Sequence, residues 1–72
     1  MTIMQSVYSD SVDRVGHDPE KNELLVQWKV GKTYVYSGVP ADLADEVRNS
    51  WSVGKAIREQ VRDKFPHKYA DE

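Results

Sequence analysis

The fold is decided by residues 23–40, which read ELLVQWKVGKTYVYSGVP. At residues 24–29 apolar side chains occupy every second position, which is the period of a half-buried β-strand. Gly31 interrupts this pattern, and residues 33–36 follow as a second run of strong strand formers. The stretch therefore predicts an antiparallel hairpin that turns near Gly31.

The hairpin has two possible registers, and they place the tyrosines on opposite faces. In the first, residues 31–32 form a two-residue turn, and Tyr34 and Tyr36 point to solvent beside Lys29. Exposed aromatic rings next to a lysine would form a platform on which RNA bases stack. Under this register Tyr34, Tyr36 and Lys29 are the candidate RNA-stacking residues.

In the second register, residues 29–31 form a three-residue loop with the glycine in the left-handed region. This loop pairs Val26 with Tyr34 and Leu24 with Tyr36, so that the large side chains share one face. We prefer this register because a small core needs its aromatic side chains for packing. The tyrosines are then core residues first, with their hydroxyls at the rim.

Working outward from the hairpin, residues 11–17 are expected to form a further strand. Residues 18–22, which read DPEKN, are typical of a turn in which Asp18 bonds the backbone and Asn22 adopts the left-handed conformation. These elements predict a three-stranded antiparallel meander.

Two helical segments follow the hairpin. Pro40 suits the first turn of a helix, and a break is expected at residues 49–51. Ser52 is placed to cap a second segment from Val53 to about Phe65, in which apolar side chains recur at every fourth position. The predicted fold class is α+β, with one face of the meander packed by a C-terminal helix of helix–break–helix form.

The chain of 72 residues has room for a single domain, expected at residues 10–66 between flexible tails at 1–9 and 67–72. Cysteine is absent, and the two histidines have no third ligand at a suitable spacing, so no metal and no cofactor are expected. Nearly all bulky apolar side chains are needed for the core, which speaks against an enzyme with a small-molecule substrate.

No apolar run exceeds three residues, and the N-terminus does not resemble a secretory signal. We therefore expect a cytoplasmic protein without a membrane partner. The net charge is −2 with a pI of about 5.6. The charge is unevenly spread: residues 1–23 carry an excess of three negative charges, and residues 55–68 an excess of three positive ones.

The positive charges of the second helical segment form a stripe. Lys55, Arg58 and Arg62 are spaced so that they share a helix face, and Lys64 and Lys68 would extend it. Such a stripe is either an ordinary solvated face or a contact surface for an acidic partner.

Two aromatic residues outside the hairpin are further candidates for partner binding. Trp51 falls in the break between the helical segments and is expected to plug the core, with an exposed anchor as the alternative. Tyr8 lies in the expected N-terminal tail, where it could become ordered when a partner binds.

The ordered series Leu24-x-Val26-x-Trp28-x-x-Gly31-x-x-Tyr34-x-Tyr36-x-x-Val39-Pro40, followed by Ser52-Val53-Gly54 and Ile57-Arg58, resembles the KTSC domain. This family is named after its occurrence at the C-terminus of some lysyl-tRNA synthetases, and it also occurs as free-standing short proteins. The chain departs from the family pattern at Trp28, where phenylalanine is usual, and at Trp51, where a small residue is usual. The resemblance implies a compact sheet-plus-helix fold without catalytic residues, and it suggests RNA as a ligand.

The preferred functional hypothesis is a non-enzymatic binding protein that regulates a larger protein machine by occlusion or displacement. Its uneven charge suits docking on a charged surface such as the transcription apparatus, with RNA polymerase as a possible partner, and the size suits a phage-encoded regulator. The alternative is an RNA-binding module that uses the sheet tyrosines or the basic helix stripe.

Overall fold

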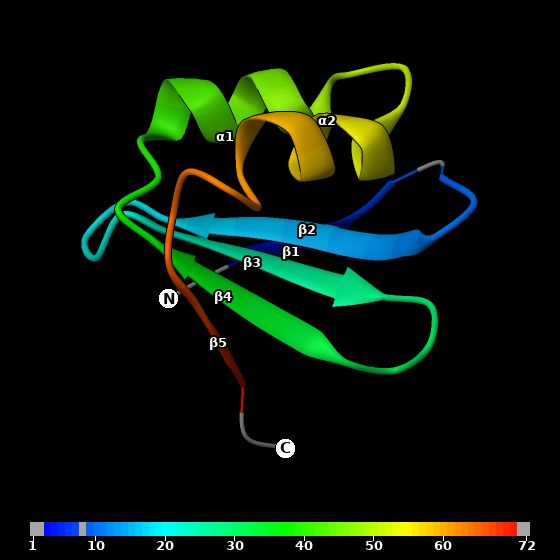
Figure 1. The fold of residues 1–72 in the computed structure, drawn as a ribbon, viewed down its shortest axis with the longest axis horizontal. Coiled ribbons are helices and arrows are strands. Elements are labelled where there is room, and N and C mark those ends of the chain that lie inside the picture. Colours follow the sequence, from blue (N-terminus) through cyan, green and yellow to red (C-terminus); the bar gives the residue numbers. More distant parts are fainter. Residues whose placement is uncertain (1–2, 8, 71–72) are drawn as a thin grey trace.

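The computed structural model describes residues 3–7 and 9–70 and forms two layers (Figure 1). One layer is an antiparallel sheet with the strand order β1-β2-β3-β4-β5, and both helices lie on the same face of it. In chain order the elements are β1 (Ile3–Ser6), β2 (Val12–Asp18), β3 (Glu23–Trp28), β4 (Thr33–Ser37), α1 (Ala41–Arg48), α2 (Val53–Gln60) and β5 (His67–Tyr69). The α+β class and the antiparallel meander are confirmed.

The predicted number of three strands is wrong, because the sheet has five. The additional strands come from the two segments expected to be flexible tails. β1 pairs with β2, with Ile3 opposite His17, and β5 pairs with β4, with Tyr34 opposite Tyr69. β1 has no hydrophobic period, and all three residues of β5 are exposed, so neither strand shows the apolar alternation of a half-buried strand.

The helical part also differs from the prediction of one broken C-terminal helix. α1 and α2 are separate helices, and α2 ends at Gln60 rather than near Phe65. At this end the backbone N–H groups of Val61 and Arg62 both donate to the carbonyl of Ile57, at 3.0 and 2.8 Å. The last turn therefore widens and cannot continue as an α-helix. Ser52 occupies the N-cap position, but its side chain makes no capping hydrogen bond.

The hairpin at Gly31 has the three-residue loop that we preferred. The N–H of Trp28 donates to the carbonyl of Lys32 at 2.8 Å, and Gly31 has a φ of +100°. Val26 lies opposite Tyr34 and Leu24 opposite Tyr36, as that register requires. The β-branched Val30 lies in this loop, where its side chain is 84% exposed.

The turn at residues 18–22 also has the predicted chemistry. The carboxylate of Asp18 accepts a hydrogen bond from the N–H of Glu20 at 3.0 Å, and Asn22 adopts the left-handed conformation with a φ of +52°.

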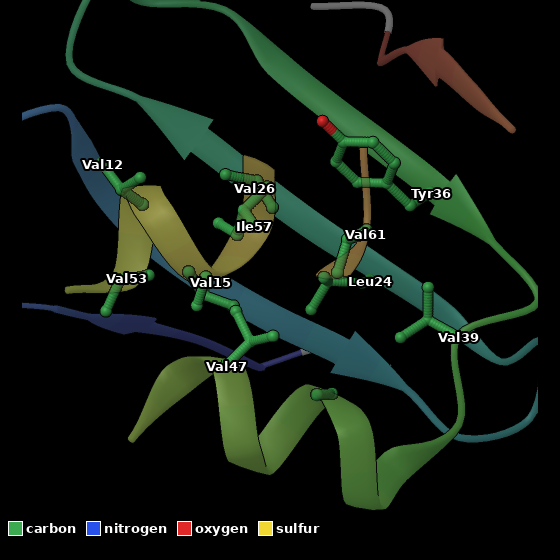
Figure 2. Packing of buried hydrophobic residues seen from close by; sticks show 12 residues of the cluster. Val12, Val15, Leu24, Val26, Tyr36, Val39, Val47, Val53, Ile57 and Val61 are labelled. Carbon is green, nitrogen blue, oxygen red and sulfur yellow. The ribbon is translucent and has the colours of Figure 1, made fainter. Parts of the chain in front are cut away.

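The core lies between the helices and the central strands (Figure 2). The helices contribute the buried side chains of Val47, Val53, Ile57 and others, and Val61 follows directly after α2. Tyr36 belongs to this cluster and is only 2% exposed, whereas Tyr34 and Trp28 are partly buried at its margin. In residues 3–7 and 9–70, neither helix is long and apolar enough to cross a membrane.

Candidate functional site

A groove with a volume of about 610 Å³ opens between α2, the hairpin loop at residues 29–31 and the β4–β5 side of the sheet. Five aromatic side chains line it, namely Trp28, Tyr34, Tyr36, His67 and Tyr69, and we call it the aromatic groove. α2 and the residues just after it supply the opposite wall, with Ile57, Arg58 and Arg62.

Strand pairing brings the aromatic residues to one face. Tyr34 lies opposite Tyr69, and Tyr36 lies opposite His67, so each pair shares a side of the sheet. Trp28 reaches the same side because it follows two residues after Val26, the partner of Tyr34 on β3. The floor of the aromatic groove is therefore a consequence of register on three neighbouring strands.

The ring of Tyr34 occupies the centre of this floor. It stacks on the His67 ring, with 5.2 Å between centroids and 7° between planes. The rings of Tyr69 and Trp28 meet it edge to face, at centroid distances of 4.9 and 6.0 Å. Tyr34 is thus held in place by three rings, while Tyr69 is 61% exposed and forms the accessible rim.

Among the described residues, four cationic side chains and a single carboxylate also line the aromatic groove. The cations are Lys29, Lys32, Arg58 and Arg62, all exposed, and the carboxylate belongs to Asp10. The ammonium of Lys32 lies 5.9 Å from the centre of the Tyr69 ring, within reach of a cation–π interaction. A chain with a net charge of −2 therefore concentrates positive charge around its aromatic floor.

The pKa values of two groove tyrosines, Tyr34 and Tyr36, are raised, so both phenols are neutral at physiological pH. Hydrogen bonding with the Tyr69 side chain raises the pKa of Tyr34 above its usual value, and desolvation adds to this. Burial raises the pKa of Tyr36, and the Tyr34 phenol acts in the same direction. The positive charge of Arg62, which lines the same groove, opposes both increases in pKa.

The aromatic groove unites residues that the sequence suggested as two separate alternatives. Tyr34, Tyr36 and Lys29 were candidates for RNA stacking, and Arg58 and Arg62 were candidates on the helix stripe. Tyr36 is a core residue whose exposed part contributes only a small area to the groove.

The other candidates lie apart from the aromatic groove. Lys55 and Trp51 line a neighbouring depression at the start of α2. Lys64 is exposed in the turn after α2 and lines neither hollow. Tyr8 lies outside the described residues.

Trp51 is not the core plug that we expected. Its side chain lies in the break between α1 and α2 and is 98% exposed. A ring of this size on the surface is available for contact with a partner.

His67 and Tyr69 are groove residues that the sequence reasoning missed. Both fall in the segment expected to be a tail, and both are placed only by the pairing of β5 with β4. The one signal is that His67-x-Tyr69 repeats the aromatic alternation of Tyr34-x-Tyr36 directly after Pro66.

Among residues 3–7 and 9–70, no group of three His, Asp or Glu side chains could hold a metal ion. His17 has a structural contact instead. Its Nε2 lies 2.7 Å from the carbonyl oxygen of Val39 and ties β2 to the connection between β4 and α1.

Comparison with known proteins gives consistent results. The sequence profile of the KTSC domain matches residues 8–65. A protein of Tsukamurella paurometabola is 31% identical over 62 residues, which cover 86% of this chain and 92% of that protein. The crystal structure of a KTSC domain protein from Yersinia pestis superimposes with a TM-score of 0.90 at 26% identity, covering 99% of this chain and 100% of that one.

Proposed function

This chain belongs to the KTSC domain family, and we propose that it is a non-enzymatic cytoplasmic protein that binds single-stranded RNA in its aromatic groove. The observation that carries the proposal is that one groove combines a floor of aromatic rings with four cationic side chains. Rings of this kind stack with bases, and cations of this kind pair with phosphates.

The charge of the aromatic groove supports an anionic ligand. Lys29 and Lys32 border the hairpin end, and Arg58 and Arg62 border the helix side, so a phosphate chain could be contacted from both walls. Arginine is well suited to this role because its planar group can both pair with phosphate and stack on a ring.

The accessible rings of the aromatic groove favour a single strand over a duplex as the ligand. Stacking on Tyr69 or His67 requires the flat face of a base, which a duplex hides between its neighbouring base pairs. Both side chains are exposed, and Tyr69 presents its ring at the rim. Stacking of this kind tolerates different bases, so the expected sequence preference is weak.

Binding without catalysis is the simpler proposal for these side chains. Asp10 is the single carboxylate among the described groove residues, and the His67 ring is stacked on Tyr34. A general acid and base working as a pair would each need a free approach to a reacting atom.

The test is fluorescence anisotropy with a labelled single-stranded RNA of ten mixed-sequence nucleotides. We expect the wild-type chain to bind, and the double variant Arg58→Glu, Arg62→Glu to bind at least about tenfold more weakly at 50 mM salt, because two phosphate contacts become repulsive. Both arginines are exposed, so circular dichroism should show an unchanged fold.

The matched control is the double variant Lys21→Glu, Lys68→Glu, which changes the net charge by the same amount. Lys21 lies in the turn before β3, and Lys68 pairs with Val35, one residue out of step with the groove-facing pairs of β4 and β5. Equal losses in both double variants would mean that only overall charge matters, and the aromatic groove would not be the binding site.

A protein partner is the second candidate, favoured by the large apolar side chains on the surface. Val30, Trp51 and Tyr69 are 84%, 98% and 61% exposed. A regulator that docks on a larger machine such as RNA polymerase would use such anchors. A pull-down from bacterial lysate with and without nuclease separates the candidates: a stoichiometric protein that survives nuclease supports docking, whereas a signal that disappears supports RNA.

A further inference from the structure

We infer that the RNA path continues from the aromatic groove along α2 and ends on Trp51, which stacks one further base. This inference rests on the proposed RNA-binding function and extends it to a second surface. It assigns a binding role to Trp51, which does not line the aromatic groove.

The path is continuous because the two hollows share a wall. A depression with a volume of about 380 Å³ lies at the start of α2, between Trp51 and Lys55, and we call it the Trp51 depression. Asp10, Ser11 and Arg58 line both the Trp51 depression and the aromatic groove. A strand that leaves the aromatic groove past Arg58 therefore enters the Trp51 depression directly.

Positive charge follows the same route. Lys55 and Arg58 are exposed on α2, and the exposed Arg62 follows two residues after its end. Lys55 lines the Trp51 depression, Arg58 lines both hollows and Arg62 lines the aromatic groove. Aromatic rings stand at both ends of the stripe, Tyr69 in the aromatic groove and Trp51 beyond Lys55. This order of ring, cations and ring fits a strand of about four nucleotides, the smallest site that single-strand binding domains use.

Gly54 keeps the middle of the path open. A Cβ atom at this position would lie 2.6 Å from the Ser11 hydroxyl and 3.4 Å from a guanidinium nitrogen of Arg58. The connection between β1 and β2 can therefore approach α2 closely, and no side chain of residue 54 stands between Trp51 and Arg58.

The exposure of Trp51 agrees with a role that needs a free ring. Its side chain is 98% exposed, so the folded chain gains little from this large apolar group. An indole offers the largest flat surface among side chains on which a base can stack.

Asp10 and Ser11 favour RNA over DNA on this path. A carboxylate repels phosphates, but it accepts a hydrogen bond from a hydroxyl, and the Ser11 hydroxyl can donate or accept one. The ribose 2′-hydroxyl supplies both functions, and DNA lacks it. We therefore expect a DNA strand of the same base sequence to bind more weakly than RNA.

The experiment measures anisotropy with labelled RNAs of three and eight nucleotides, using the wild-type chain, Trp51→Ala, Trp51→Phe and Tyr69→Ala. The trinucleotide fits the aromatic groove alone, whereas the octanucleotide can also reach Trp51. We expect Trp51→Ala to weaken octanucleotide binding at least about fivefold, the lower end of the contribution of one stacked base, and to change trinucleotide binding less than twofold. Trp51→Phe should restore most of the loss, and Tyr69→Ala should weaken both RNAs.

Tryptophan emission gives a second readout. The chain has two tryptophans, and Trp51 is the fully exposed one, so RNA should quench the wild-type emission more strongly than that of Trp51→Ala. Equal affinities of wild type and Trp51→Ala for the octanucleotide, with a loss in Tyr69→Ala, would overturn the path and leave the aromatic groove as the site. No binding of either RNA to the wild-type chain would overturn the RNA function itself. Stoichiometric capture of a protein that Trp51→Ala loses would then reassign Trp51 to protein docking.

Discussion

At the scale of single residues, Tyr34 and Tyr36 stand two positions apart on β4, and both belong to the helix-covered side of the sheet. Tyr36 is 2% exposed within the hydrophobic cluster, whereas Tyr34 lies at its margin among the rings of the aromatic groove. Tyr36→Ala should lower the free energy of unfolding by about 3–5 kcal/mol, and Tyr34→Ala by clearly less. Urea denaturation followed by circular dichroism measures both; losses of equal size would contradict this division.

Gly54 leads to a prediction about close approach. Replacing a glycine inside a helix with alanine normally raises the free energy of unfolding by about 1 kcal/mol. Here the new methyl group would meet the Ser11 hydroxyl at 2.6 Å, so we expect Gly54→Ala to lower the stability instead. In a chain that also carries Ser11→Ala the same substitution should be tolerated, because the next neighbours lie at 3.4 and 3.9 Å. A gain in stability from Gly54→Ala alone would show that the contact does not matter.

The raised tyrosine pKa values predict a loss of stability in alkali. Burial raises the pKa of Tyr36 above its usual 10.0, so the folded chain holds this proton more tightly than the unfolded chain. The stabilisation is complete below about pH 10 and is lost as the pH rises through the folded-state pKa. The urea midpoint should therefore fall as the pH rises above about 10, and Tyr36→Phe should flatten this fall. A midpoint that rises with pH in this range would contradict the assignment.

At the scale of elements, β5 has an influence out of proportion to its three residues. It supplies two rings of the aromatic groove and is held by the pairs Tyr34–Tyr69, Val35–Lys68 and Tyr36–His67. A chain that ends at Phe65 should lose about 2 kcal/mol of stability, the sum expected for a few aromatic cross-strand pairs. Its circular dichroism spectrum should still show both helices, and its affinity for the octanucleotide should fall. Unchanged stability and affinity would mean that β5 is dispensable.

The same strand shows where sequence reasoning stops at this scale. The hairpin register could be predicted because Leu24, Val26 and Tyr36 must all reach the core, and one three-residue loop allows it. The position of β5 could not be predicted, because its residues are exposed and its pairing depends on backbone hydrogen bonds. One of these runs from the Ala70 N–H to the Thr33 carbonyl at 2.9 Å. Backbone pairing of this kind requires no particular side chain, so it leaves no pattern to read.

At the scale of the whole molecule, the net charge of −2 is a poor guide to the charge that a ligand meets. Acidic side chains gather in the N-terminal part of the chain, and four cations gather around the aromatic groove. RNA binding should therefore weaken with salt: with about three phosphate contacts, a rise from 50 to 200 mM salt should lower the affinity on the order of tenfold. Anisotropy titrations across this range measure the slope, and a slope near zero would exclude phosphate contacts.

The sequence by itself determined the central hairpin, the turn before it, the existence of two helical segments and the kinds of side chain that could bind a partner. These features follow from local alternation and from turn residues such as Gly31 and Asn22, whose conformations need no distant contact. Only the tertiary structure decided that Trp51 is exposed and that Arg58 and Arg62 face Tyr34 and Tyr69 across one groove. The reason is that the packing of α2 and the pairing of β5 bring together residues that are far apart in the sequence. No local sequence pattern specifies such long-range contacts.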